Sequence, residues 1–120
     1  MNFSSAIQAH SNWKLRLYAA CHGSSNDAID MHTLAQDNAC ELGKWLYGTG
    51  QKYASEAQFG ELKTAHAAFH RSAASIAKMI EGGKRTEAEA LLSSPESEYC
   101  KLSVSVVGFL MGFKARHGDT

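Results

Sequence analysis

The sequence predicts an all-α fold, an antiparallel four-helix bundle with one additional short helix. Alanine occurs 18 times in the 120 residues, whereas valine, isoleucine and threonine together occur 12 times. Alanine favours helices and β-branched residues favour strands, so this composition argues against a sheet protein. Apolar residues also recur at alternating spacings of three and four, as in a helix that buries one face. The length suits a single domain over residues 1–120, with a helical core over about 3–115.

Glycine and polar clusters divide the chain into five predicted helical segments. Breaks are expected at 23–27, at 48–50 and at Gly82–Gly83. The run Ser93–Glu96 is interpreted as the start of the last helix, because serine caps helices while proline and acidic residues favour the first turn. The expected helices cover about residues 3–22, 35–47, 55–81, 84–92 and 95–115. Short connections between such segments are typical of a bundle.

The predicted core follows from the apolar stripes of the three longest segments. The stripe residues are Phe3, Ala6, His10, Trp13, Leu17 and Ala20; Phe59, Leu62, His66, Phe69, Ala73, Ile76 and Ile80; and Leu92, Pro95, Tyr99, Leu102, Val106, Phe109 and Phe113. Two histidines occupy positions that otherwise hold apolar residues. A buried imidazole needs partners, because an unpaired polar group in a core costs about 1–3 kcal/mol.

Charge and cysteine content exclude several classes of protein. Lysine plus arginine equals aspartate plus glutamate, twelve each, so we expect no nucleic-acid partner and no polybasic membrane anchor. The apolar stretch Val104–Phe113 is too short to span a bilayer, and the N-terminus lacks the pattern of a secretory signal. Three cysteines do not make a disulfide scaffold. We therefore expect a cytoplasmic location with reduced thiols.

Histidine spacing indicates a metal site. His70 follows His66 by four residues, so the two side chains share a helix face about 40° apart and can point at one ion. His10 on another stripe and the thiol of Cys40 would complete a tetrahedral zinc set of three histidines and one cysteine. The alternatives are a core histidine at position 10 bonded to a backbone carbonyl or a serine, and a cysteine at position 40 that is a buried small hydrophobe.

The remaining cysteines and histidines have simpler interpretations. Cys21, His22 and His32 form a second candidate cluster, interpreted as solvated because it lies at a helix end and in a loop. Cys100 is expected on the polar side or edge of the last helix in a structural role. His117 lies near a frayed terminus and carries no functional prediction.

Three motifs in order resemble the chemoreceptor zinc-binding (CZB) domain family. They are the stretch from His10 to Tyr18 with Trp13 three residues after the histidine, the Cys-x-x-Gly-x-Trp segment from Cys40 to Trp45, and His66-x-x-x-His70. The resemblance extends over nearly the whole chain, including Glu87–Leu92 and Lys101–Ser103. It implies a helical bundle that binds one zinc ion through His10, Cys40, His66 and His70.

The same resemblance implies a role in bacterial signalling. Members of the family regulate chemoreceptors or diguanylate cyclases, several act as homodimers, and some sense oxidants at the zinc-bound cysteine. Here that implies cyclic-di-GMP signalling or chemotaxis, a homodimer, and a signalling output domain or protein as partner.

Three functions remain open at this point. The first is a zinc-binding sensory or regulatory domain, with zinc or an oxidant as the input. The second is a structural zinc-stabilised dimerisation module that does not sense. The third, a metallohydrolase, is disfavoured because four protein ligands leave no position for water and Ala67 stands where His-Glu-x-x-His places its general base. We therefore expect a protein that is not an enzyme.

Overall fold

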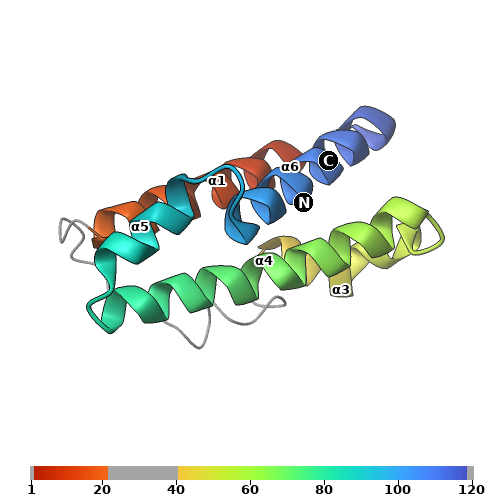
Figure 1. Cartoon of the computed structure of the whole chain (residues 1–120). Helices are drawn as coiled ribbons and strands as arrows, with labels where there is room; N and C mark the ends of the chain where they lie inside the picture. Colours follow the sequence, from red (N-terminus) through yellow and green to blue (C-terminus); the bar gives the residue numbers. More distant parts are fainter. Residues whose placement is uncertain (1, 22–40, 119–120) are drawn as a thin grey trace.

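The computed structural model describes residues 2–21 and 41–118, and within them all regular structure is helical (Figure 1). The elements are α1 (Phe3–Cys21), α3 (Glu41–Tyr47), the 3-10 helix η1 (Thr49–Tyr53), α4 (Ala57–Glu81), α5 (Arg85–Ser93) and α6 (Glu98–His117). No strand occurs among the described residues. The all-α bundle predicted from composition and periodicity is confirmed.

The long helices lie side by side around one core. In Figure 1, α1 and α4 run in the same direction, and α5 followed by α6 returns in the opposite one. Helix α6 packs against both α1 and α4, and α5 likewise contacts both of them. The short elements α3 and η1 lie beside the first half of α4. This arrangement brings the middle of α1 next to the middle of α4, where the histidines of the two stripes lie.

Among the predicted helix boundaries that fall within the described residues, those at Phe3, Tyr47 and Glu81 match the structure, whereas the start of the last helix is wrong. The break at Gly82–Gly83 is confirmed: α4 ends at Glu81, and Gly83 has a φ of 86°, in the left-handed region that favours glycine. The last helix begins at Glu98, three residues later than predicted. Ser97 caps it, because its Oγ accepts a hydrogen bond from the Cys100 N–H at 3.2 Å and donates to the Leu91 carbonyl at 2.6 Å.

The stripe predictions describe most of the core. Leu92, Tyr99, Val106 and Phe113 are buried as expected, but Pro95 is exposed and Leu110, which the stripe omitted, is fully buried. Pro95 precedes the cap residue Ser97 and therefore lies outside α6, whereas Leu110 lies between Val106 and Phe113 at spacings of four and three, on the same helix face. The stripe residues that are only half-buried are Trp13, Ala20, Ile80, Leu102 and Phe109.

An aromatic cluster closes one end of the bundle and holds α3 against the long helices. The Trp45 ring lies 5.4 Å from the ring of Phe3, 6.0 Å from that of Phe59 and 6.0 Å from that of Phe113, measured between centroids. Trp45 is only 6% exposed. The indole therefore fixes α3 to α1, α4 and α6 at once.

Gly50 allows η1 to approach Trp45 closely. A Cβ atom at position 50 would lie 2.6 Å from the Trp45 carbonyl oxygen and 2.7 Å from its ring. We expect Gly50→Ala to lower the free energy of unfolding by about 1–3 kcal/mol, because the backbone or the indole must move. Urea unfolding measures the loss. Gly82→Ala is the control, since a Cβ there meets atoms only at 3.5 Å or more, and an equal loss in both variants would contradict this explanation.

Candidate metal centre

Three histidines from two helices meet inside the bundle. His10 comes from α1, and His66 and His70 come from successive turns of α4. Their exposed fractions are 3%, 0% and 2%. Histidine is seldom so completely buried in a core, and three of them together need a physical explanation.

The distances between the imidazoles match a shared ion. The Nε2 atoms of His66 and His70 are 3.0 Å apart, and one potential ligand atom from each of the three histidines lies within 4.8 Å of the others. In a tetrahedral zinc site with bonds of about 2.0–2.1 Å, ligand nitrogens lie about 3.3 Å apart. The α4 pair is close to this spacing, and a potential ligand atom of His10 lies within 4.8 Å of both. The sequence-based expectation that these histidines lie together is confirmed.

A hydrogen bond orients His10 for ligation. Its Nδ1 lies 2.9 Å from the carbonyl oxygen of Ala6, one turn earlier in α1. A carbonyl can only accept, so Nδ1 carries the proton and Nε2 keeps its lone pair. Among the described residues, this buried Nε2 has no hydrogen-bond partner. Such an arrangement is typical of a metal-binding histidine, whose second nitrogen is held by a backbone carbonyl. The bond to a backbone carbonyl that the sequence analysis raised as an alternative for His10 is therefore present, with Ala6 as the acceptor.

Burial keeps the imidazoles of His10 and His66 neutral. Removal from water lowers the pKa of His66 to about 3, with further lowering from positive charge on His70 and His10. Burial also lowers the pKa of His10, partly opposed by the hydrogen bond to Ala6. At neutral pH both therefore present unprotonated nitrogens, the form that a metal ion requires.

The depressed pKa of His66 predicts acid sensitivity of the metal-free chain. The unfolded chain takes up a proton near pH 6.5, while folded His66 does so only near pH 3. Stability is therefore fully present above about pH 6.5 and is lost as the pH falls from there toward 3. We expect a loss on the order of a few kcal/mol between pH 7 and pH 4, measured by urea unfolding with a chelator present. In His66→Gln, the pH dependence should shrink, and an unchanged profile would contradict the assignment.

Cys40, the fourth expected ligand, lies outside the described residues. The next described residue is Glu41, the first residue of α3, and the side chains of Leu42 and Trp45 on this helix are buried. His22 and His32 of the second candidate cluster also lie outside the described residues.

The described cysteines and His117 differ from their sequence-based interpretations. Cys21 is buried and not solvated, and burial, together with the charge of Glu89, raises the pKa of its thiol. Cys100 is not on a polar face but is buried at the junction of α5 and α6, with its Sγ 3.2 Å from the Leu92 carbonyl oxygen. His117 is not at a frayed end, because it stacks on Tyr53 with centroids 4.3 Å apart and bonds Glu56 at 3.0 Å. Sequence alone could not bring these partners together.

Comparison with protein families identifies the chain. The model of the family described as "chemoreceptor zinc-binding domain" matches residues 10–77, more than half of the chain. The chain belongs to the chemoreceptor zinc-binding (CZB) domain family. Comparisons with curated proteins and with solved structures give no match.

Membership of the CZB family identifies the metal as zinc. The matched stretch runs from His10 past His70, so it includes all three clustered histidines and Cys40. Zinc is the cofactor of this CZB domain, and its three buried histidines are suited to coordinate it. Within the described part of the chain, no helix has the length and apolar character needed to cross a membrane.

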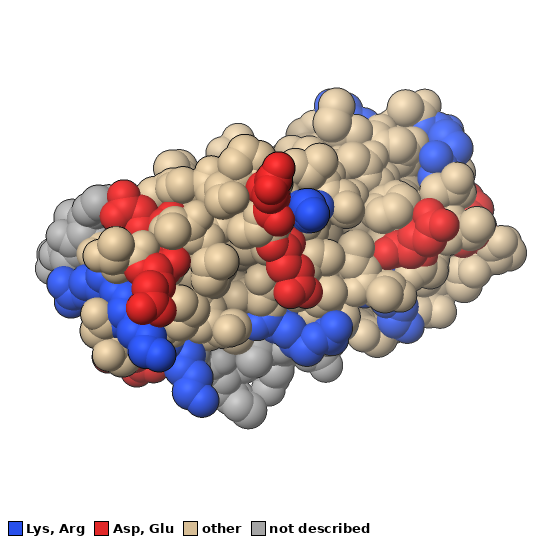
Figure 2. Space-filling view, in the orientation of Figure 1, with Lys and Arg blue, Asp and Glu red and all other residues tan. Residues whose placement is uncertain are grey.

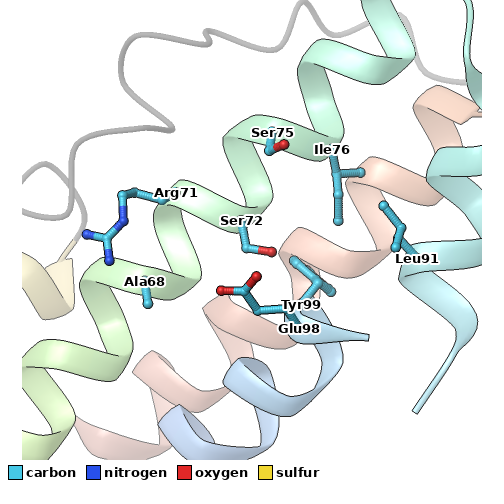
Figure 3. Close-up of a pocket in the computed structure, with 8 residues that line it drawn as sticks. All are labelled: Ala68, Arg71, Ser72, Ser75, Ile76, Leu91, Glu98 and Tyr99. Atoms are coloured by element: carbon cyan, nitrogen blue, oxygen red, sulfur yellow. The ribbon is translucent and has the colours of Figure 1, made fainter. Parts of the chain in front are cut away.

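A surface pocket of the CZB domain lies apart from the histidines. Figure 3 shows it between α4, α5 and the start of α6, with a volume of about 280 Å³. Its lining residues are Ala68, Arg71, Ser72, Ser75, Ile76, Leu91, Glu98 and Tyr99, and none of them is a histidine or a cysteine. The Glu98 carboxylate points toward Ser72, whereas Arg71 extends away from it (Figure 3). Because these polar groups do not converge, the histidine cluster is the stronger candidate for the functional site.

Proposed function

We propose that this CZB domain is a regulatory zinc-binding domain of bacterial signal transduction that binds one zinc ion through His10, Cys40, His66 and His70. The observation that carries the proposal is the buried triad, in which three imidazoles from two helices bring ligand atoms within 4.8 Å of one another. The family match adds the zinc-binding class.

Cys40 is proposed as the fourth ligand because the triad supplies only three donors. A thiolate beside imidazoles is a soft ligand that zinc favours, and three histidines with one cysteine form a closed tetrahedral shell. When bound, zinc supplies a cross-link between α1, α4 and the segment that precedes α3. A closed shell has no open position for water, which favours regulation over metallohydrolase chemistry.

Cys40→Ala tests the ligand set. We expect zinc affinity to fall by more than 100-fold while most of the helical circular dichroism remains, because the described helices share a core of apolar side chains. A competition titration against a chromophoric chelator measures the affinity. Cys100→Ala is the matched control, since its sulfur hydrogen-bonds carbonyl oxygens of α5 and Cys100 is not part of the histidine cluster. Unchanged affinity in Cys40→Ala would refute the assigned set.

Packing around the histidines supports a sensory role over a purely structural one. The Phe69 ring lies 5.2 Å from that of His10 and 5.8 Å from that of His70, between centroids. On its other side it lies 5.3 Å from the ring of Tyr99 on α6. A change in the distance between α1 and α4 at the triad would therefore displace the Phe69 ring. Because the core is tightly packed, this displacement would move the Tyr99 ring and with it α6.

A comparison of the metal-free and zinc-loaded protein distinguishes a sensory role of zinc from a structural one. We expect the metal-free domain to stay folded with shifted helices, seen as retained far-ultraviolet circular dichroism together with faster hydrogen exchange in α1 and near Tyr99. Global unfolding on zinc removal would instead support the structural dimerisation module. Identical exchange in both forms would contradict a sensory role.

The proposal extends to the input and to the partners. Oxidation of a Cys40 thiolate by hydrogen peroxide, which transfers one oxygen to the sulfur to give a sulfenate and releases water, would remove one ligand and mimic loss of zinc. The output is proposed to be a chemoreceptor or a diguanylate cyclase, and the working unit a homodimer. We expect zinc to copurify with a dimer. Removal of this zinc by a chelator should change the output of the cyclase or receptor.

A further inference from the structure

Phe69 lies against the triad of His10, His66 and His70. Its ring is fully buried, with a centroid 5.2 Å from that of His10 and 5.8 Å from that of His70. Both distances are within the range of direct contacts between rings, about 4.5–7 Å. Phe69 follows His66 by three residues in α4, so it lies about 60° around the helix from that histidine. One side chain therefore covers a flank of the cluster that two helices build.

Tyr99 of α6 packs against the Phe69 ring in turn. The two centroids are 5.3 Å apart, and Tyr99 is only 1% exposed. Tyr99 is also part of the wall of the surface pocket between α4, α5 and the start of α6 (Figure 3). That pocket, about 280 Å³ in volume, has room for several waters, because one water takes about 30 Å³. The contacts therefore lead from the pocket to Tyr99, then to Phe69 and then to His10.

The core around the triad is apolar. Among the side chains that the structure describes, no lysine, arginine, aspartate or glutamate is buried, and Figure 2 shows these side chains at the surface. Besides nitrogen and sulfur, zinc takes carboxylate or water oxygens as ligands. Because no described carboxylate is buried beside the triad, an additional ligand on the Phe69 side would have to be water.

We propose that Phe69 is a positioning residue that keeps the zinc site at four ligands. The inference rests on the proposed function, in which His10, Cys40, His66 and His70 are those ligands. The Phe69 ring fills the space through which a water molecule would reach the ion from the pocket side. The same ring packs on His10 and His70 and so restricts the orientations of both imidazoles. An apolar shell of this kind controls the access of solvent to a metal site.

Exclusion of water matters for the regulatory role. A zinc site that keeps a position for water is typical of catalytic centres, whereas a site with four protein ligands is closed. A closed site changes only when it loses a protein ligand or the ion itself. Phe69 therefore makes the site respond to these two events and keeps it closed to hydrolytic chemistry.

Visible absorption of the cobalt-loaded chain tests the proposal. Cobalt(II) binds to the same kinds of ligand as zinc, and with four tetrahedral ligands it absorbs visible light more strongly than with five. We expect Phe69→Ala to leave room for a water and to lower the visible absorption per bound cobalt by about twofold or more. Zinc affinity should also fall, by about tenfold, because the groups around the ligands would hold them less well.

Two further variants distinguish exclusion of water from a general loss of packing. Phe59→Ala removes an equally large ring from α4, where Phe59 is 4% exposed and its centroid lies 6.0 Å from that of Trp45 in the aromatic cluster. Phe69→Leu keeps most of the side-chain volume and leaves too little room for a water. Both variants should lose stability and yet retain the wild-type spectrum. If Phe69→Ala does not fold, Phe69→Val replaces it, because valine also leaves room for a water.

The wild-type spectrum in the folded alanine or valine variant of Phe69 would overturn the proposal. An equal loss of absorption in Phe59→Ala or Phe69→Leu would overturn it too, because the effect would then follow from packing in general. Metal uptake by the wild type is measured first and keeps the two proposals apart. A wild type that binds neither cobalt nor zinc would overturn the proposed function, whereas a metal-loaded wild type with an unaffected Phe69 variant would overturn this inference alone.

Discussion

Replacing His66 with glutamine is expected to lower zinc affinity by more than 100-fold without unfolding the domain. His66 is completely buried, and its Nε2 lies 3.0 Å from that of His70, so it stands at the centre of the cluster. Glutamine keeps a polar side chain of similar length but removes the imidazole, and three remaining donors bind zinc more weakly than four. Competition with a chromophoric chelator measures the affinity.

His117→Gln is the matched control for this experiment. It makes the same substitution on α6, where the imidazole bonds Glu56 and stacks on Tyr53 away from the triad. Zinc affinity in this variant should equal that of the wild type. An equal loss in both variants would mean that the effect is on folding, and the assignment of His66 as a ligand would fail.

Phe113→Ala is expected to produce the largest loss of stability, about 3–5 kcal/mol. The Phe113 ring is fully buried, with centroids 6.0 Å from Trp45, 5.9 Å from Tyr53 and 6.2 Å from Phe3. Its removal leaves a cavity where α1, α3, η1 and α6 meet, and these rigid rings cannot collapse into it without separating the helices. Urea unfolding at a concentration too low for association measures the change.

Phe109→Ala provides the comparison on the same helix. Phe109 is only half-buried and lines the groove between α4 and α6, so its truncation should cost less than half as much. Equal losses for the two phenylalanines would contradict the view that the aromatic cluster anchors this end of the bundle.

Helical periodicity predicted the long elements because burial on one face repeats every three or four residues. The stripes of α1 and α4 named His10 and His66 as inward-facing, and the four-residue spacing added His70. The break at Gly82–Gly83 was equally predictable, since Gly83 adopts a positive φ that other residues avoid.

Features that depend on contacts between distant segments could not be predicted. Ser93 and Ser97 are both suitable helix caps, and the choice of Ser97 depends on the Leu91 carbonyl that its hydroxyl also reaches. Stacking of His117 on Tyr53 joins residues from α6 and η1, which only the folded chain brings together. The burial of Cys100 likewise follows from the way α5 turns into α6.

The measurement that tests the account most directly is X-ray absorption at the zinc edge of the purified chain, together with metal content. The account predicts one zinc per chain, with three nitrogen neighbours at about 2.0–2.1 Å and one sulfur at about 2.3 Å. A first shell of oxygen and nitrogen alone, or zinc that remains bound after replacement of both His66 and His70, would contradict it.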